Sequence, residues 1–193
     1  MFFAQIRQSQ KKGASDKIII NCEYSAACFS SNERKTSTKS DRKSMEISAN
    51  LKGIMESVVI EDLFAGSQID VYIELIQDDG GSYSACINAT TLALVDAGIP
   101  MRDYVVACTG TMTHGVPMVD INSQERGSGC AEVTVAVLGQ TNEIIALDLT
   151  QVLQHSYIEE TIQEAIKGCM LVHKVLEEAV RHKFIKMEKS LTV

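Results

Sequence analysis

The stretch from Ser82 to Ala97 constrains the fold most, because it predicts a helix with almost no charge on any side. Asp78-Asp79-Gly80-Gly81 forms a turn before it, and Gly98 and Pro100 end it. A helix that is apolar nearly all round must be covered by the rest of the protein. We therefore expect it to be the core helix of a domain, buried on most of its surface.

Alternating apolar and polar residues predict strands on both sides of this helix. Residues 68–77 set Ile69, Val71, Ile73 and Leu75 against polar neighbours, which is typical of a strand with one buried face. Residues 17–29 are rich in β-forming side chains and predict another strand. Four more strands are expected at 104–111, 116–121, 132–138 and 144–149, where Gly, Asn and Ser form the turns.

Two further amphipathic helices are expected. From Asp41 onward, with Ser40 or Asp41 as the N-cap, the apolar residues recur at helical spacing. These are Ile47, Leu51, Ile54, Met55 and Val58. The last helix carries Ile158, Ile162, Ile166, Cys169, Val172, Leu176 and Val180 on one face. Because both faces of a sheet must be covered, the pattern predicts an α+β fold of mixed sheets with packed helices.

Composition limits the classes of function. With 193 residues and 45% hydrophobic content the chain can form one domain with its own core, and this domain could be built as two lobes. A net charge of −7 excludes a protein whose whole surface binds nucleic acid, so any binding of a polyanion needs a local basic patch. No apolar stretch approaches the ~20 residues of a membrane span, and we expect no secretory signal.

The six cysteines form no CxxC motif and lie mostly in apolar runs. We therefore expect them to be reduced core residues, and the protein to belong to the cytosol or nucleus. Cys108, His114 and Cys130 do not have the spacing of a closed zinc site. We accordingly expect no metal and no cofactor.

A basic segment stands out in this acidic chain. Between residues 33 and 43, five cations oppose two anions; the cations are Arg34, Lys35, Lys39, Arg42 and Lys43. Cations in the first turn of a helix oppose its dipole, a cost that a bound phosphate would offset. The segment therefore favours an anion-binding surface, and a solvated charge run without function is the alternative.

Several blocks in order make the chain resemble the RNase PH family, and within it the ring subunits of the RNA exosome. They are residues 21–25 (NCEYS), 33–35 (ERK), 41–44 (DRKS), 67–72 (SQIDVY), 79–81 (DGG) and 92–103 (LALVDAGIPMRD). The resemblance covers residues 17–186, an RNase PH-like domain, followed by a tail at 187–193. It implies a fold of the ribosomal protein S5 domain 2-like type.

The resemblance also implies partners and a location. Such domains pair into dimers, and three dimers close a hetero-hexameric ring of RNase PH-like subunits around an RNA channel, with S1/KH-type cap subunits. The location implied is the nucleus and nucleolus, and also the cytoplasm. In this family the segment that holds Arg34, Lys35, Lys39, Arg42 and Lys43 contacts the RNA backbone, without reading its sequence.

The positions that carry chemistry in active relatives are altered here. Active members place an arginine after the Asp-Gly-Gly turn to hold phosphate, and this position is Tyr83. Their carboxylate pair falls on Asp120 and Arg126, and a further acidic position falls on Glu132. Losing one preorganised electrostatic contact costs ~10²–10³ in rate, so we expect no catalytic residues here.

Alternatives stay open at several of these points. Arg126 is expected to pair with Glu125 or Asp120, or else to touch RNA. Asp120 is expected to be a remnant of a lost active site or a loop-capping residue. An active phosphate-dependent 3′-5′ exoribonuclease with a rearranged site is the second hypothesis. A small-molecule α/β enzyme that uses the Asp-Gly-Gly turn, or a truncated product without an assembly role, is the third.

Residues 1–16 do not match the arginine- and glycine-rich start of the family. We therefore expect the N-terminal strands of the fold to be truncated, which would leave the strand at 17–29 at an exposed edge of its sheet.

Overall fold

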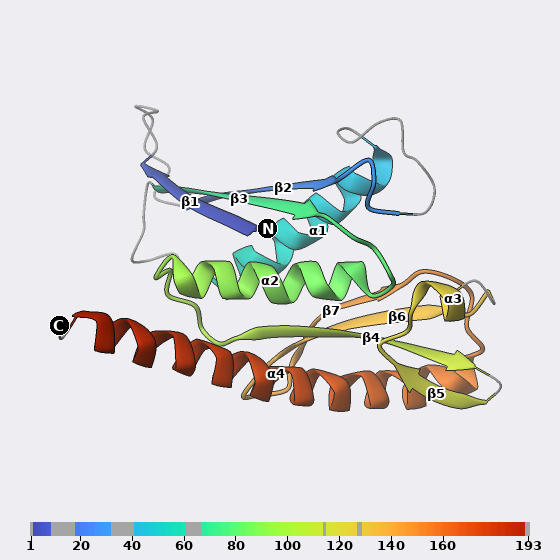
Figure 1. Ribbon diagram of the computed structural model, residues 1–193. Helices are drawn as coiled ribbons and strands as arrows, with labels where there is room; N and C mark the ends of the chain where they lie inside the picture. Colours follow the sequence, from blue (N-terminus) through green and yellow to red (C-terminus); the bar gives the residue numbers. More distant parts are fainter. Residues whose placement is uncertain are drawn as a thin grey trace.

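The computed structural model describes residues 2–8, 18–31, 41–60, 67–113, 115–126 and 129–191. In these ranges the chain forms two sheets with helices between and beneath them (Figure 1). Sheet, helix layer, sheet and helix follow one another in space. The α+β class with mixed sheets is therefore confirmed.

The first sheet has the strand order β1-β3-β2. Strand β1 (Phe2–Gln8) runs antiparallel to β3 (Ser67–Leu75), while β2 (Ile19–Ala26) runs parallel to it. Helix α1 (Arg42–Val58) connects the two parallel strands and buries Leu51, Ile54, Met55 and Val58 against them. The segment 1–16, set apart on sequence grounds, thus contributes a strand to this sheet.

Strand β2 lies at an edge of the first sheet, as expected for residues 17–29, although the strand β1 is present and pairs with the other side of β3. Part of that edge is covered by α1. The backbone N–H of Tyr24 donates to the hydroxyl of Ser48 at 3.0 Å, and this hydroxyl donates in turn to the carbonyl of Ser44 at 2.8 Å.

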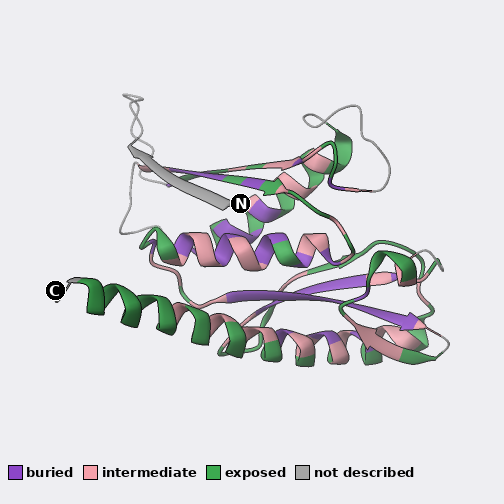
Figure 2. Ribbon diagram, viewed as in Figure 1, coloured by how far each residue is buried: buried purple, intermediate pink, exposed green. Residues whose placement is uncertain are grey.

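The second sheet is antiparallel, with the order β5-β4-β6-β7. Its strands are β4 (Val105–Thr113), β5 (Val116–Val119), β6 (Glu132–Leu138) and β7 (Ile144–Leu149). Strand β4 is buried along almost its whole length (Figure 2). Val105 and Ala107 pack into the core shared with the first sheet, whereas Val106 and Cys108 pack on the opposite side. One central strand thus serves two cores.

Helix α2 (Ser82–Asp96) lies between the sheets, and α4 (His155–Leu191) covers the outer face of the second sheet (Figure 1). The expectation that α2 is buried nearly all round is wrong on one side. Ala85 is exposed, and Ala89, Leu92 and Ala93 line a groove that faces the C-terminal half of α4. That half of α4 extends past the sheet and is largely exposed (Figure 2).

Candidate functional site

The Asp-Gly-Gly turn and the loop after β5 are in direct contact. A Cβ atom on Gly80 would lie 2.1 Å from the carbonyl oxygen of Ile121, and Gly80 has φ +110°, so only glycine fits. The hydroxyl of Ser123 donates to a carboxylate oxygen of Asp79 at 2.6 Å. These contacts hold the N-terminus of α2 beside residues 120–123.

Asp120 lies at this junction. Its backbone has φ +60°, and its N–H donates to the carbonyl of Thr109 at 2.8 Å. Its carboxylate oxygen Oδ1 is 3.5 Å from the place where a Cβ atom of Gly81 would be. Gly81 is the N-cap of α2, and no side chain caps this helix. Asp120 therefore faces a helix terminus whose partial positive charge attracts anions.

A row of hydroxyl groups continues from this terminus into the second sheet. Ser84 donates to the carbonyl of Gly81 at 2.7 Å, and Thr109 donates to the hydroxyl of Ser84 at 3.2 Å. Thr134 lies 3.2 Å from Thr109 on the neighbouring strand. All three hydroxyl-bearing residues are buried, so this row is satisfied within the protein.

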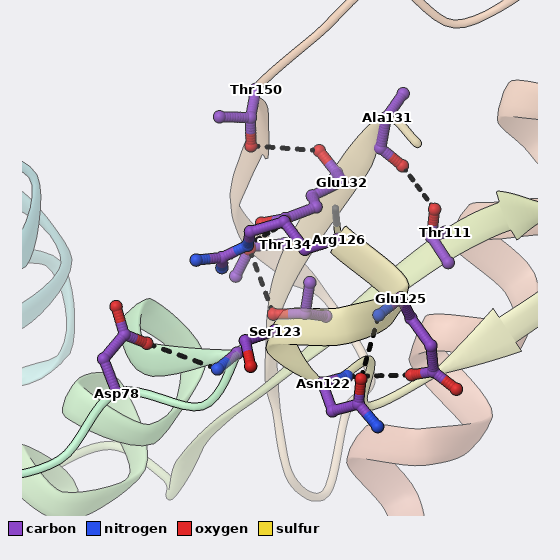
Figure 3. A network of polar contacts seen from close by, with 12 residues as sticks. Asp78, Thr111, Asn122, Ser123, Glu125, Arg126, Ala131, Glu132, Thr134 and Thr150 are labelled. Carbon is purple, nitrogen blue, oxygen red and sulfur yellow. Dashed lines mark hydrogen bonds and ion pairs between the residues drawn. The ribbon is translucent and has the colours of Figure 1, made fainter. Parts of the chain in front are cut away.

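Arg126 and Glu132 form an ion pair with two contacts (Figure 3). The Nη2 atom of Arg126 donates to Oε2 of Glu132 at 3.0 Å, and Nε donates to Oε1. These hydrogen bonds raise the pKa of the Arg126 guanidinium, so the group remains a cation. The expectation that Arg126 pairs with Glu125 or Asp120 is therefore wrong, and Glu132 is occupied by a cation of its own chain.

Glu125 instead caps the short helix α3 (Ser123–Arg126). The N–H of Asn122 donates to Glu125 Oε2 at 2.8 Å, while the side-chain oxygen of Asn122 accepts from the N–H groups of Gln124 and Glu125 at 3.0 and 2.9 Å (Figure 3). This is a capping box, which fixes the orientation of the helix that carries Arg126.

Tyr83 lies in a different environment. It lines a cavity of about 470 Å³ between α1 and β7, together with Asn50 and Asp148 among others. Burial, and then the charge of Asp148, raises the pKa of Tyr83 to about 12, although a hydrogen bond with Asn50 acts in the opposite direction. Its phenol is therefore neutral at physiological pH. A neutral phenol cannot supply the positive charge that phosphate binding needs.

Of the five basic candidates, Arg34, Lys35 and Lys39 lie outside the described residues. Arg42 and Lys43 are exposed in the first turn of α1. This turn contains no acidic residue, and its N-cap Asp41 makes no side-chain capping hydrogen bond. The two cations are thus available to an external anion.

The described ranges contain no group of three His, Cys, Asp or Glu side chains that could hold a metal ion. His114 lies outside these described ranges. Nor do they contain a helix long and apolar enough to span a membrane.

Residues 3–100 match the RNase PH family, described as the 3′ exoribonuclease family, domain 1. The bovine exosome complex component RRP41 is 38% identical over 177 residues, which cover 92% of this chain and 72% of the relative. This chain belongs to the RNase PH family. The matched range begins within the segment 1–16 that the sequence analysis had set apart.

Two further proteins are similar over most of the chain. Exosome complex component Rrp41 of Pyrococcus horikoshii is 39% identical over 176 residues, 91% of this chain and 70% of the relative. The crystal structure of rice (Oryza sativa) Rrp46 has a TM-score of 0.76 with 17% identity and covers 91% of this chain and 81% of that chain. This last likeness supports the fold alone.

Within this RNase PH domain the structure separates the four candidate site positions named from the sequence. Asp120 faces the N-terminus of α2, Arg126 and Glu132 bind each other, and Tyr83 lies in the cavity beside α1 and β7. Asn122 and Ser123, which hold this loop in place, were not among the residues predicted from the sequence. The Asn-x-x-Glu spacing of residues 122–125 was a readable signal for the capping box.

Proposed function

We propose that this chain is a noncatalytic, RNA-contacting subunit of an exosome ring, which supports 3′-5′ RNA degradation and ribosomal RNA processing. The observation that carries the proposal is the pairing of Arg126 with Glu132. One position of the family's carboxylate pair has become a cation, and that cation neutralises the next acidic position. The carboxylate that remains, Asp120, lacks the second acid with which it would act.

The altered phosphate position supports the same proposal. Tyr83 stands at the position of the arginine that follows the Asp-Gly-Gly turn in active relatives, and its phenol, whose pKa burial raises to about 12, stays neutral. Electrostatic stabilisation requires charges preorganised around the reacting phosphate. Here the chain supplies neither the cation nor the carboxylate pair.

RNA contact would come from the basic segment, residues Arg34, Lys35, Lys39, Arg42 and Lys43. The relatives named above are exosome components, so the partners proposed are other RNase PH-like subunits in a hetero-hexameric ring, with S1/KH-type caps. In that setting the subunit would act in the nucleus and nucleolus and in the cytoplasm. Phosphate contacts from exposed cations grip RNA without reading its sequence.

A second candidate is an active phosphate-dependent 3′-5′ exoribonuclease. It is favoured by Asp120, whose carboxylate lies against the N-terminus of α2, where no side chain caps the helix. A helix terminus of this kind accepts phosphate readily.

A phosphorolysis assay separates the two candidates. The purified chain, alone and copurified with RNase PH-like partners, is incubated with labelled RNA and orthophosphate. We expect no release of nucleoside diphosphates by this chain. Release that Asp120→Ala abolishes, and that the exposed carboxylate variant Glu143→Gln leaves intact, would establish the second candidate instead.

A further inference from the structure

Strand β7 has an open edge. Within the described residues it pairs only with β6, and it is the last strand of its sheet. The N–H of Thr150 donates to the carbonyl of Glu132 at 3.0 Å, which fixes the hydrogen-bonding pattern of the pair. In an antiparallel pair, successive residues of a strand point their N–H and C=O groups alternately toward the partner strand and away from it. Since Thr150 points toward β6, the backbone groups of Leu147 and Leu149 point away from it.

The backbones of Leu147 and Leu149 have no hydrogen-bond partner in the part of the chain that the structure describes. Their side chains are also exposed, as is that of Ile144 on the same strand. An edge strand with free N–H and C=O groups and exposed apolar side chains is a template for another strand.

The open edge borders the cavity that contains Tyr83. Ala49, Asn50, Gly53 and Ser57 of α1 form its other wall, and its volume is about 470 Å³. A Cβ atom on Gly53 would meet nothing within 4 Å, so this wall leaves free space opposite the strand. Helix and strand thus form a groove rather than a closed contact.

We propose that this groove binds an extended segment of a partner protein, which adds as a strand to the open edge of β7 and places a basic side chain beside Asp148. Strand addition uses the free backbone groups for affinity and the neighbouring side chains for specificity. The proposal goes beyond the proposed function, since nothing in it depends on RNA or on catalysis.

The charge at the groove favours a peptide over RNA. Asp148 is exposed, and it is the one charged residue among the described residues that line the groove. Its carboxylate repels phosphate groups and attracts a lysine or arginine side chain.

The same charge disfavours a second copy of the chain as the occupant. Two β7 strands paired antiparallel through Leu147 would bring both Asp148 carboxylates to one face of the new ladder. The two carboxylates would be diagonal neighbours about 7–8 Å apart, where like charges still repel each other. A partner with a cation at this position gains the interaction that a second copy would lose.

The test uses the full chain and a labelled, capped hexapeptide of alternating valine and threonine with one lysine. We expect saturable binding in fluorescence anisotropy. Leu147→Pro removes one N–H from the open edge, where proline is tolerated, and should weaken binding about tenfold. Leu147→Ala keeps that N–H and is the matched control, with a loss of about threefold or less.

Two further measurements do not depend on the folding of the proline variant. A hexapeptide that is N-methylated on the edge that faces β7 when its lysine lies beside Asp148 should bind the unaltered chain about tenfold more weakly. That edge cannot donate, and use of the opposite edge would turn the lysine away from Asp148. Asp148→Asn should weaken the lysine peptide severalfold and leave a glutamine version unchanged.

Four outcomes would overturn the proposal. The first is no saturable binding of the lysine peptide at millimolar concentration. The second is an equal loss for Leu147→Pro and Leu147→Ala with no effect of N-methylation. The third is a dimer of the free chain that Leu147→Pro dissociates, which would make a second copy the occupant. The fourth is displacement of the peptide by oligouridylate, which would make RNA the occupant.

Discussion

The guanidinium of Arg126 and the carboxylate of Glu132 bind each other through two contacts, and the Glu132 side chain is only 12% exposed. Arg126 comes from the short helix α3 and Glu132 from the first residue of β6. The pair therefore joins the loop after β5 to the sheet.

We expect Arg126→Gln to lower the free energy of unfolding by about 1–2 kcal/mol, because it leaves the largely buried Glu132 carboxylate without its cation. Glu132→Gln and the double variant complete a mutant cycle, read by urea unfolding. The coupling energy should be about 1 kcal/mol or more. If the two single effects simply added, the pair would contribute nothing beyond its separate residues.

Alkaline pH should destabilise the protein partly through Tyr83. Burial raises the pKa of Tyr83 to about 12 from 10.0, so above pH 10 the unfolded chain loses this proton while the folded chain keeps it. The free energy of unfolding therefore falls as the pH rises from about 10 to about 12.

The Tyr83→Phe variant should show a smaller fall over that interval, and its stability relative to the wild type should not depend on pH below 9. Unfolding curves at pH 8, 10 and 11.5 measure this. Tyr24, whose pKa burial also raises to about 12, keeps its own contribution in both proteins. Identical pH profiles for the two proteins would refute the assignment to Tyr83.

Two glycines in helices should respond oppositely to the same substitution. A Cβ atom on Gly168 would lie 2.7 Å from Val119 Cγ1 and 2.9 Å from Cys108 Sγ, so Gly168→Ala should cost about 1–3 kcal/mol through overpacking of α4 on the sheet. Gly53 in α1 has no atom within 4 Å of its Cβ position. Gly53→Ala should stabilise by up to about 1 kcal/mol, measured by thermal unfolding.

Charge reversal at the start of α1 should have opposite effects on RNA binding and on stability. Arg42→Glu with Lys43→Glu removes two exposed cations, so RNA affinity should fall and the slope of log K against log salt should decrease in size by about 1.4. Because acids suit a helix N-terminus, the same change should stabilise α1 by about 0.5 kcal/mol.

Anisotropy of labelled oligouridylate at several salt concentrations and a thermal melt give both readouts. The matched control, Lys52→Glu with Glu56→Lys, keeps the net charge of α1 and exchanges an ion pair further along the helix. Unchanged RNA affinity in the Arg42 and Lys43 variant would show that this patch is only a solvated surface.

Sequence alone predicted the elements of the fold well, since their signals are local. Turn residues separated β4 to β7, and the helical spacing of Leu51, Met55 and Val58 placed α1. The local pattern did not show that residues 2–8 would pair along β3, because strand pairing depends on residues far apart in the chain.

The candidate site was less predictable for the same reason. The identities of Tyr83, Asp120, Arg126 and Glu132 could be read from the sequence, but their neighbours could not. In the capping box, Glu125 accepts a hydrogen bond from Asn122, while the guanidinium of Arg126 binds Glu132. Tyr83 shares a cavity with Asn50 of α1, which lies more than thirty residues earlier in the chain.

The hydrogen bond from Tyr24 to Ser48 has a consequence for how the molecules behave at high concentration. A neighbouring molecule that extended the first sheet past β2 would have to break this bond and shift α1, which is anchored in the core through Leu51 and Met55. Fibril growth by repeated strand stacking is therefore hindered at that border. Ser48→Ala removes the obstacle without touching the core.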